Sequence, residues 1–571
     1  MVIAGDDHAR HCARDKGRAY WSAALPIVLE KHGYLDFEVR DPSVLEDRDA
    51  LTGRAGVLVG ALPEAAWTSR MLGVLDESPC PVLLESPLPE PVLRLLGVTR
   101  CTPLEPSGHL VLSPDAGERV VARGGRLGAP VAERRISTVR ADPSMHWSCL
   151  AGDLITPEMA DAWRETSWDA FGWSATDPLV EAMWVTAGGE RSPALVRRGN
   201  IWAASFGLFA FLGQAHTAEP WEPGEARATG DPGTVELLML EVIDAMHAVA
   251  GVPRARVLPW PEGYDWALNV RHDFDRGLAP EAVAETLARH DRAGTSATWY
   301  WRARHLQHPD APLRHARRNT VVHTANDHPE PEIGDWPTRM RTDEAPANQA
   351  VRLVARHPRH EVALHTEMVW IGAGHERRLV EAVAGVPVHG SCAHGNPWCF
   401  RFQGAPSVLW AARQGLSYTE NFQVLHRHPY RFAGLRADGS VGPIDVLCLP
   451  KHASLDQQIT TPDTRSNEVL AAAPDWRAAG GLLQVMNHPD INQDALFDLL
   501  HRLPAERRWN VTAETAARWW AATHVSDRVR LRVAGDGTPS IDGVDVDDRV
   551  QIEVLLPDRS RRVSRADARP G

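Results

Sequence analysis

The segment that most constrains this chain is residues 266–275, an apolar stretch of strand character that ends in two acidic residues, Asp273 and Asp275. In a strand, residues i and i+2 point to the same face. If strand geometry persists to the end, both carboxylates point into one small volume. Two like charges that close repel each other unless a cation lies between them or one of them is protonated. The pattern therefore predicts a metal site with an adjacent base.

Three further strand-like segments end at a histidine. His365 lies at the end of residues 360–365, His394 follows residues 389–393, and His488 follows residues 482–487. In α/β barrels the residues at the carboxyl ends of the strands carry the chemistry. We therefore expect these histidines to meet the two aspartates at one rim of a barrel.

The length of 571 residues is too great for a single domain. Residues 57–60 and 81–85 read as buried strands, and residues 19–31 and 234–250 read as helices, which is typical of an open α/β sheet. The prolines and glycine of residues 259–263 break regular structure and indicate a boundary.

We expect an α/β protein of three parts. Residues 1–255 should form an open α/β sheet domain with a β-rich, partly helical insertion over about residues 107–180. Residues 256–525 should form a distorted (β/α) barrel. Residues 526–571 should form a small β-rich tail with a disordered end.

Composition excludes several classes of function. The net charge of −13 argues against a broad nucleic-acid surface. The seven cysteines are scattered without a C-x-x-C pair, so neither a disulfide framework nor a zinc ribbon is indicated. No apolar run of membrane-spanning length occurs, and charged residues near the start interrupt any signal peptide. We therefore expect a cytoplasmic protein with no membrane partner, of unknown oligomeric state.

The four segments, in this order, resemble the polysaccharide deacetylase family of metal-dependent N- and O-deacetylases, over roughly residues 266–522. In that family an Asp pair after the first barrel strand supplies a base and a metal ligand. His365-Thr366 is similar to the start of the family's second motif, although Val369 stands where a second histidine is usual. Asn487-His488-Pro489 matches the final motif, an apolar strand that ends in His-Pro.

Divergent members of the family have an Asp-x-Asp first motif and take a metal ligand from a later segment. Cys392-Ala393-His394 lies at the corresponding place. The N-terminal half resembles class I glutamine-amidotransferase-like domains, through residues 57–60, 81–87 and 194–197. The nucleophilic cysteine between glycines that such domains use is absent, so we expect this half to do no chemistry.

The resemblance implies a metal-dependent carbohydrate deacetylase that acts on an N-acetylated amino sugar or glycoconjugate precursor. We assign Asp275, His365 and His394 as metal ligands, Asp273 as base and His488 as general acid. Zinc is the expected metal, with cobalt, nickel or iron as alternatives. The roles of the two aspartates can be exchanged. Rivals of His394 for the third ligand are His389, Glu367 and His323.

Two other functions stay open at this point. The same barrel could serve a small-molecule amidohydrolase. The missing second histidine could instead mark a degenerate site in a binding or scaffold protein.

Overall fold

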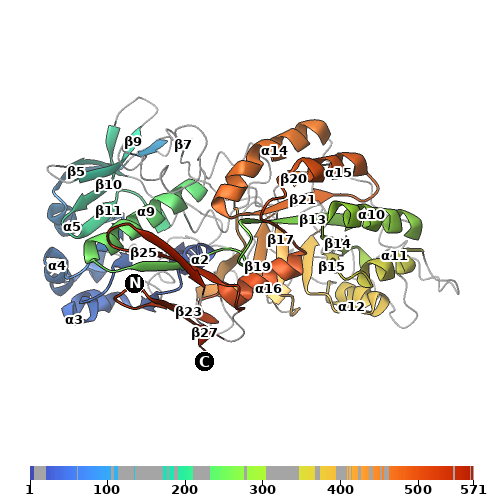
Figure 1. The fold of residues 1–571 in the computed structure, drawn as a ribbon. Helices are drawn as coiled ribbons and strands as arrows, with labels where there is room; N and C mark the ends of the chain where they lie inside the picture. Colours follow the sequence, from blue (N-terminus) through green and yellow to red (C-terminus); the bar gives the residue numbers. More distant parts are fainter. Residues whose placement is uncertain are drawn as a thin grey trace.

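The computed structural model describes most of the chain, in segments. The described residues are 1–4, 21–60, 62, 64–103, 109–112, 134–135, 171–175, 179–185, 191–209, 212, 232–274, 279–303, 306, 346–366, 373–393, 408, 411–412, 414–421, 426–435, 441–450, 453–455, 462–543, 547–565 and 568–569. The two halves of the chain each build a mixed or parallel sheet with helices, and they lie side by side (Figure 1).

The N-terminal half contains a nine-stranded sheet, among the described residues, in the order β2-β1-β3-β4-β11-β10-β9-β6-β7. Its first five strands pair in parallel and the others in antiparallel fashion. Its strands are β1 (Val2–Ala4), β2 (Glu38–Arg40), β3 (Val57–Val59), β4 (Val82–Glu85), β6 (His109–Leu112), β7 (Arg134–Arg135), β9 (Leu179–Val185), β10 (Arg191–Arg198) and β11 (Ile201–Ala204), and β5 (Val98–Pro103) pairs separately with β8 (Phe171–Ala175).

Helices cover both faces of this sheet because its central strands are apolar on both sides. They are α2 (Trp21–Lys31), α3 (Arg48–Leu51), α4 (Ser69–Asp76), α5 (Glu90–Leu95) and α9 (Pro232–Ala250). Val57 and Val59 of β3 pack in one apolar cluster with residues of α4 and α5. Leu58, between them, packs in another with residues of α2 and α9. The expected open α/β sheet is confirmed. Strand β8 lies in the segment for which the sequence predicts a β-rich, partly helical insertion.

The C-terminal half contains a ten-stranded sheet, among the described residues, in the order β18-β19-β17-β16-β15-β14-β13-β21-β20, with β22 beside β13. All pairs are parallel except β18 with β19. Its strands are β13 (Trp266–Phe274), β14 (Ala297–Trp301), β15 (His360–Thr366), β16 (Gly390–Ala393), β17 (Tyr418–Asn421), β18 (Tyr430–Leu435), β19 (Val441–Pro450), β20 (Ala453–Ser454), β21 (Leu482–Asn487) and β22 (Arg508–Asn510).

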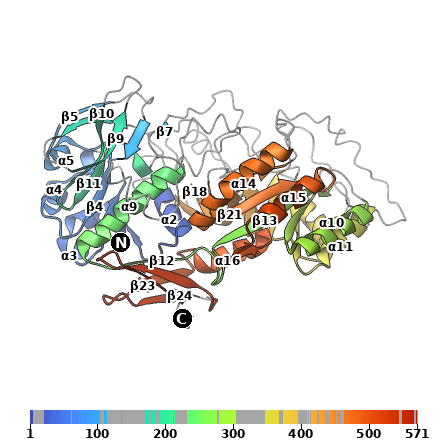
Figure 2. The same cartoon turned by 45° about the horizontal axis from the view of Figure 1, so that its top comes forward.

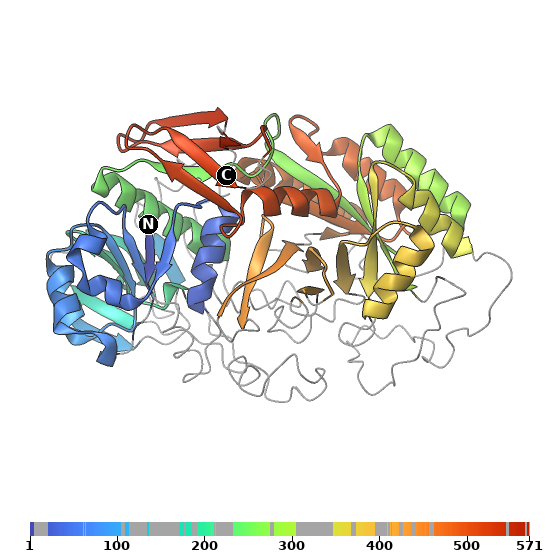
Figure 3. The same cartoon turned by 90° about the horizontal axis from the view of Figure 1, so that it is seen from below.

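One face of this sheet is covered by helices that follow its strands (Figure 1). They are α10 (Pro280–Ala293), α11 (Pro346–Ala355), α12 (Ala373–Ala384), α14 (Pro462–Ala479) and α15 (Gln493–Arg502). The opposite face packs against α16 (Ala513–Thr523), as the view from below shows (Figure 3). The described strands form an open path between β18 and β20, so the expected distorted (β/α) barrel is not confirmed.

The end of the chain is built into the fold. Strand β12 (Arg254–Val257) pairs antiparallel with β25 (Gln551–Leu555), which pairs with β26 (Arg561–Arg565). A second small sheet holds β23 (Val529–Val533), β24 (Pro539–Gly543) and β27 (Ala568–Arg569). These strands lie against both halves of the molecule (Figure 2). The expected disorder is therefore wrong for residues 561–565, because their backbone groups are paired with β25.

The two halves are joined by buried charges. Glu30, near the end of α2, accepts two hydrogen bonds from the guanidinium of Arg431 on β18, at 3.0 and 2.5 Å. Beside it, within the N-terminal half, Lys31 donates to both oxygens of Glu236 on α9 at 2.9 Å. All four side chains are almost fully buried.

Within the described residues, no helix is long and apolar enough to cross a bilayer.

Candidate active site

Strand β13 supplies the first residue of the site through its alternation. Trp266, Leu268 and Val270 belong to the apolar cluster on the helix-covered face. Asn269, Arg271 and Asp273 alternate with them and are also buried, which places three polar side chains on the opposite face. The predicted strand that ends in acidic residues is confirmed for Asp273. Asp275 lies outside the described residues.

The register of β15 and β16 brings two more side chains to Asp273. His365 and Cys392 are direct partners across this parallel pair. The Sγ atom of Cys392 lies 3.1 Å from Nδ1 of His365 and 3.9 Å from Oδ1 of Asp273. Nε2 of His365 lies 3.9 Å from Oδ2 of Asp273. The three residues thus offer one oxygen, one nitrogen and one sulfur atom within 4.8 Å of one another, in a buried setting.

Asp273 is held by Arg271 from the same strand. The guanidinium donates to both carboxylate oxygens, at 2.6 Å each, and its third nitrogen lies 3.3 Å from Glu420 on β17. Burial alone disfavours the ionised form of Asp273, but the charges of Arg271, His365 and His488 together outweigh it and hold its pKa below the usual range. Asp273 is therefore a permanent anion near neutral pH.

Glu420 sits on the other side of Arg271. Burial raises the pKa of Glu420 to about 7, against the opposing effect of the Arg271 charge. Its carboxylate accepts a hydrogen bond from the amide of Gln484 at 2.5 Å, and that amide also donates to Asn269. These side chains form a polar layer beneath Asp273 that fixes Arg271 in place.

His488 follows β21, the neighbour of β13 on the other side. His272 and Asn487 are direct partners in this parallel pair, so the next residues along, Asp273 and His488, lie at the same level. His488 is half-buried and close enough for its charge to lower the pKa of Asp273. The prediction that His488 shares a rim with Asp273 and His365 agrees with this register.

A string of buried histidines supports the backbone at His488 from the helix-covered face. Nδ1 of His272 lies 3.2 Å from the carbonyl oxygen of Asn487, which can only accept, so this nitrogen carries the proton. Nε2 of His272 must then accept from Nε2 of His290, 2.8 Å away. Thr295 in turn lies 2.8 Å from Nδ1 of His290. His272 therefore has a structural role, and its side chain lies on the face of the sheet opposite to Asp273.

The lower end of the same polar face is closed by α16. Glu361 of β15 accepts hydrogen bonds from Tyr418, from Thr298 and from the backbone N–H of Glu514, at 2.5, 3.0 and 2.9 Å. Burial raises the pKa of Glu361 to about 8, and these donors oppose the rise. A carboxyl group at a helix N-terminus is favourably placed. Glu361 therefore anchors α16 across the sheet and lies below the site.

The predicted site residues have different outcomes. Asp273 and His365 are brought together, with His488 beside them. Asp275, His394, Glu367 and His323 lie outside the described residues. His389 lies 3.4 Å from Glu514 at the opposite end of β16, which removes it as a rival ligand. Cys392 is not among the ligands assigned from sequence, although it belongs to the same Cys392-Ala393-His394 segment as His394.

The donor set fits a divalent metal. Carboxylate oxygen, imidazole nitrogen and thiolate sulfur are the ligands that zinc accepts in proteins. The hydrogen bonds from Arg271 resemble the support that outer residues give to a ligating carboxylate. Each carboxylate oxygen can accept from Arg271 and still offer a lone pair to a cation. The residues present could therefore hold such an ion.

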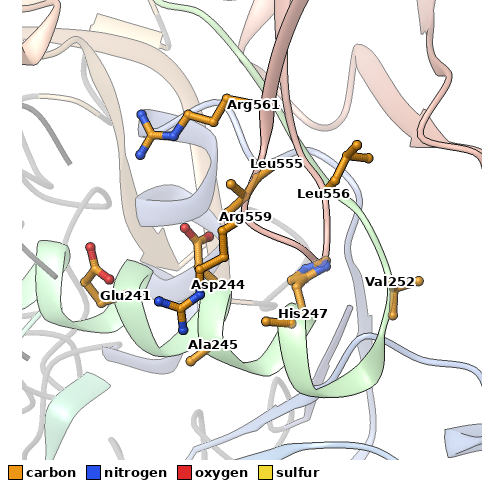
Figure 4. Close-up of a pocket in the computed structure, with 10 residues that line it drawn as sticks. Glu241, Asp244, Ala245, His247, Val252, Leu555, Leu556, Arg559 and Arg561 are labelled. Carbon is orange, nitrogen blue, oxygen red and sulfur yellow. The ribbon is translucent and has the colours of Figure 1, made fainter. Parts of the chain in front are cut away.

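A small cavity of about 140 Å³ lies elsewhere, between α9 and the β25–β26 hairpin (Figure 4). Glu241, Asp244 and His247 of the helix face Arg559 and Arg561 of the hairpin. Asp244 is already paired with buried Arg254 at 2.7 Å. No strand that carries the Asp273 cluster lines this cavity, so it is separate from the candidate site.

Comparison with known proteins gives similarities of fold at a low level. No protein-family model matches the chain, and no curated protein matches its sequence. Among solved structures, the carbohydrate deacetylase Agd3 has a TM-score of 0.34 at 10% identity, over 97% of this chain and 91% of that one.

Two other similar structures match less than half of the chain. A pseudoenzyme of the CE4 family from Bacillus anthracis has a TM-score of 0.27 at 11% identity, over 45% of this chain and 66% of that one. The polysaccharide deacetylase Bc1974 from Bacillus cereus has a TM-score of 0.24 at 9% identity, over 43% and 91%. Two of these three structures are deacetylases and one is a pseudoenzyme of the CE4 family. TM-scores this low do not show what activity the present chain has. None of the comparisons supports the amidotransferase-like resemblance of the N-terminal half.

Proposed function

We propose that this protein is a metal-dependent hydrolase that removes an acetyl group from an N-acetylated amino sugar or glycoconjugate precursor. The observation that carries the proposal is the meeting of Asp273 and His365, with 3.9 Å between ligand atoms, at the carboxyl ends of two parallel strands. His488 directly follows a third strand, at the level of Asp273. Metal-assisted hydrolysis of an amide needs ligands for the metal and a proton donor for the leaving nitrogen. Asp273 and His365 can serve as the ligands, and His488 can serve as the donor.

The sequence-based assignment made Asp273 the base and Asp275 a metal ligand, and we now propose the reverse. A carboxylate with a lowered pKa, locked by Arg271, is a weak base but a dependable anion. We therefore assign Asp273 and His365 as metal ligands. Asp275, two residues further along the chain, becomes the candidate base.

When bound, a divalent metal would supply a Lewis acid that polarises the acetyl carbonyl group. Water adds to the carbonyl carbon, and the base takes one of its protons. The C–N bond then breaks, and His488 protonates the departing nitrogen, so that acetate and a free amine are released. Arg271 keeps the carboxylate of Asp273 oriented throughout.

The test is acetate release from a panel of N-acetylated sugars and simple N-acetylated amines, before and after removal of metal by a chelator. Release from sugars that stops on chelation and returns with zinc supports the proposal. Release from the simple amines alone would favour a small-molecule amidohydrolase. Release from none of them by metal-loaded protein would favour a non-catalytic role.

The variant Asp273→Asn separates the two assignments of the aspartates. As a ligand, Asp273 should lose most of the bound metal on this change. If the variant keeps its metal while its rate falls by on the order of 10²–10⁴, Asp273 is the base and the exchange is wrong.

A further inference from the structure

We propose that the thiolate of Cys392 is a ligand of the metal, which makes this a sulfur-containing site. The inference rests on the proposed function only in that a metal is bound. It concerns which atoms hold the ion, and it remains testable whatever the substrate is.

The separations of the three donor atoms suit a common ion. With zinc bond lengths of about 2.3 Å to sulfur and about 2.0–2.2 Å to nitrogen or oxygen, tetrahedral ligand atoms lie roughly 3.4–3.6 Å apart. Cys392 Sγ lies 3.1 Å from His365 Nδ1 and 3.9 Å from Asp273 Oδ1. These two separations bracket the ideal, and the third, between the His365 nitrogen and the Asp273 carboxylate, lies within 4.8 Å, so a modest shift of the side chains would complete the geometry.

All three donor residues lie on strands of the sheet and not on loops. Cys392 and His365 are paired across adjacent parallel strands, and both are buried. Cys448 of β19 offers a contrast, because it is equally buried but packs in the apolar cluster on the helix-covered face. Of these two buried thiols in the sheet, Cys392 is the one that faces an imidazole and a carboxylate.

The charges of the cluster also favour a bound cation. A cysteine that binds a metal gives up its proton. The thiolate and Asp273 would then be two negative groups beside Arg271, and Glu420 adds a third when it is ionised. A divalent ion offsets the negative charge that Arg271 alone leaves unbalanced, which lowers the cost of burying it.

A thiolate ligand narrows the choice of metal. Sulfur favours zinc and other soft or borderline ions, whereas magnesium, calcium and manganese prefer sites built from oxygen. We therefore expect zinc or cobalt to bind the full-length protein tightly, and magnesium to compete poorly with either.

The direct test is X-ray absorption spectroscopy of the zinc-loaded full-length protein, which needs no variant. We expect one sulfur neighbour at about 2.3 Å from the zinc, together with nitrogen and oxygen neighbours at about 2.0–2.2 Å. Cobalt-loaded protein should show a sulfur-to-cobalt charge-transfer band in the near ultraviolet. The Cys392→Ser variant should lose that band, whereas Cys448→Ala should keep it.

The outcomes separate this inference from the proposed function. A bound zinc ion with only nitrogen and oxygen neighbours would overturn the role of Cys392 and leave the hydrolase proposal standing. A sulfur neighbour that persists in correctly folded Cys392→Ser protein would also overturn it. Failure of the wild-type protein to bind any divalent metal would overturn both.

Discussion

Arg271 and Asp273 lie two residues apart on β13, and the guanidinium of Arg271 donates to both carboxylate oxygens of Asp273 at 2.6 Å. Both side chains are buried, so each is the main counter-charge of the other. A bidentate contact fixes the orientation of the carboxylate as well as its charge. In our account this contact aims Asp273 at the metal.

The first prediction concerns this contact. Arg271→Lys keeps the positive charge but cannot form the planar fork, so Asp273 should lose its fixed orientation. We expect zinc affinity, measured by competition with a chromophoric chelator, to fall by roughly 10–100-fold. Arg289→Lys, in a surface pair with Asp494, is the control and should bind zinc as the wild type does. Unchanged affinity in Arg271→Lys would show that the fork has no part in metal binding.

The second prediction concerns proton donation by His488. An amine leaves only with a proton, whereas the phenolate of an activated aryl acetate leaves without one. His488→Ala should therefore lower turnover of N-acetylated substrates by on the order of 10²–10⁴ and that of aryl acetates much less. His389→Ala is the matched control, since His389 lies at the other end of β16 against Glu514. Equal losses on both kinds of substrate would indicate a binding role for His488.

The third prediction concerns the contact between the two halves. Glu30→Ala leaves the buried Arg431 without its bidentate partner. We expect the free energy of unfolding, measured by urea titration, to fall by about 3–5 kcal/mol. Glu90→Ala breaks an exposed pair with Arg94 and should cost about 0.3–0.5 kcal/mol. Similar losses in the two variants would mean that the buried pair contributes little.

The same contacts argue against independent folding of the C-terminal half. A fragment that begins at residue 259 would lack Glu30, and it would also lack β12, the partner of β25. We expect such a fragment to be much less stable than the full chain.

The fourth prediction concerns acid stability. His524 is buried and stacked on Trp520 at 3.9 Å, and burial lowers its pKa to about 3. In the unfolded chain this histidine takes up a proton near its ordinary pKa, so its contribution to stability is present above about pH 6.5 and is lost as the pH falls toward 3. Between pH 7 and 5 the loss is about 2 kcal/mol.

His524→Phe keeps an aromatic ring on Trp520 but cannot take up a proton. The free energy of unfolding of this variant should fall less steeply between pH 7 and 5 than that of the wild type. Parallel curves for the two proteins would show that His524 is not kept neutral by the fold.

Several β strands were predictable because each of them is an apolar run with clear ends. Residues 57–59, 82–85, 266–274, 360–366 and 482–487 all form strands where the apolar pattern placed them. The helix predicted at residues 234–250 forms at residues 232–250, and it ends directly before Gly251. Such local signals persist because each strand is buried on both faces.

Other features depend on partners distant in sequence, which a local pattern does not encode. The pairing of residues 561–565 with β25 turns a basic segment into a strand. Arg271 could be assigned to Asp273 from spacing alone, but Glu420 and Gln484 reach the site only through the register of β17 and β21. The sequence favours His394 over Cys392 as a ligand because histidine is the commoner ligand. The pairing of Cys392 with His365 across β15 and β16 places the thiol in the site.

The measurement that tests the central claim most directly is the metal content of the wild-type protein and of His365→Ala, after loading with zinc and removal of excess ion. The account predicts about one zinc ion per chain in the wild type and loss of most of it in the variant. Full retention of zinc by correctly folded His365→Ala protein, or a wild-type protein that retains none, would contradict it.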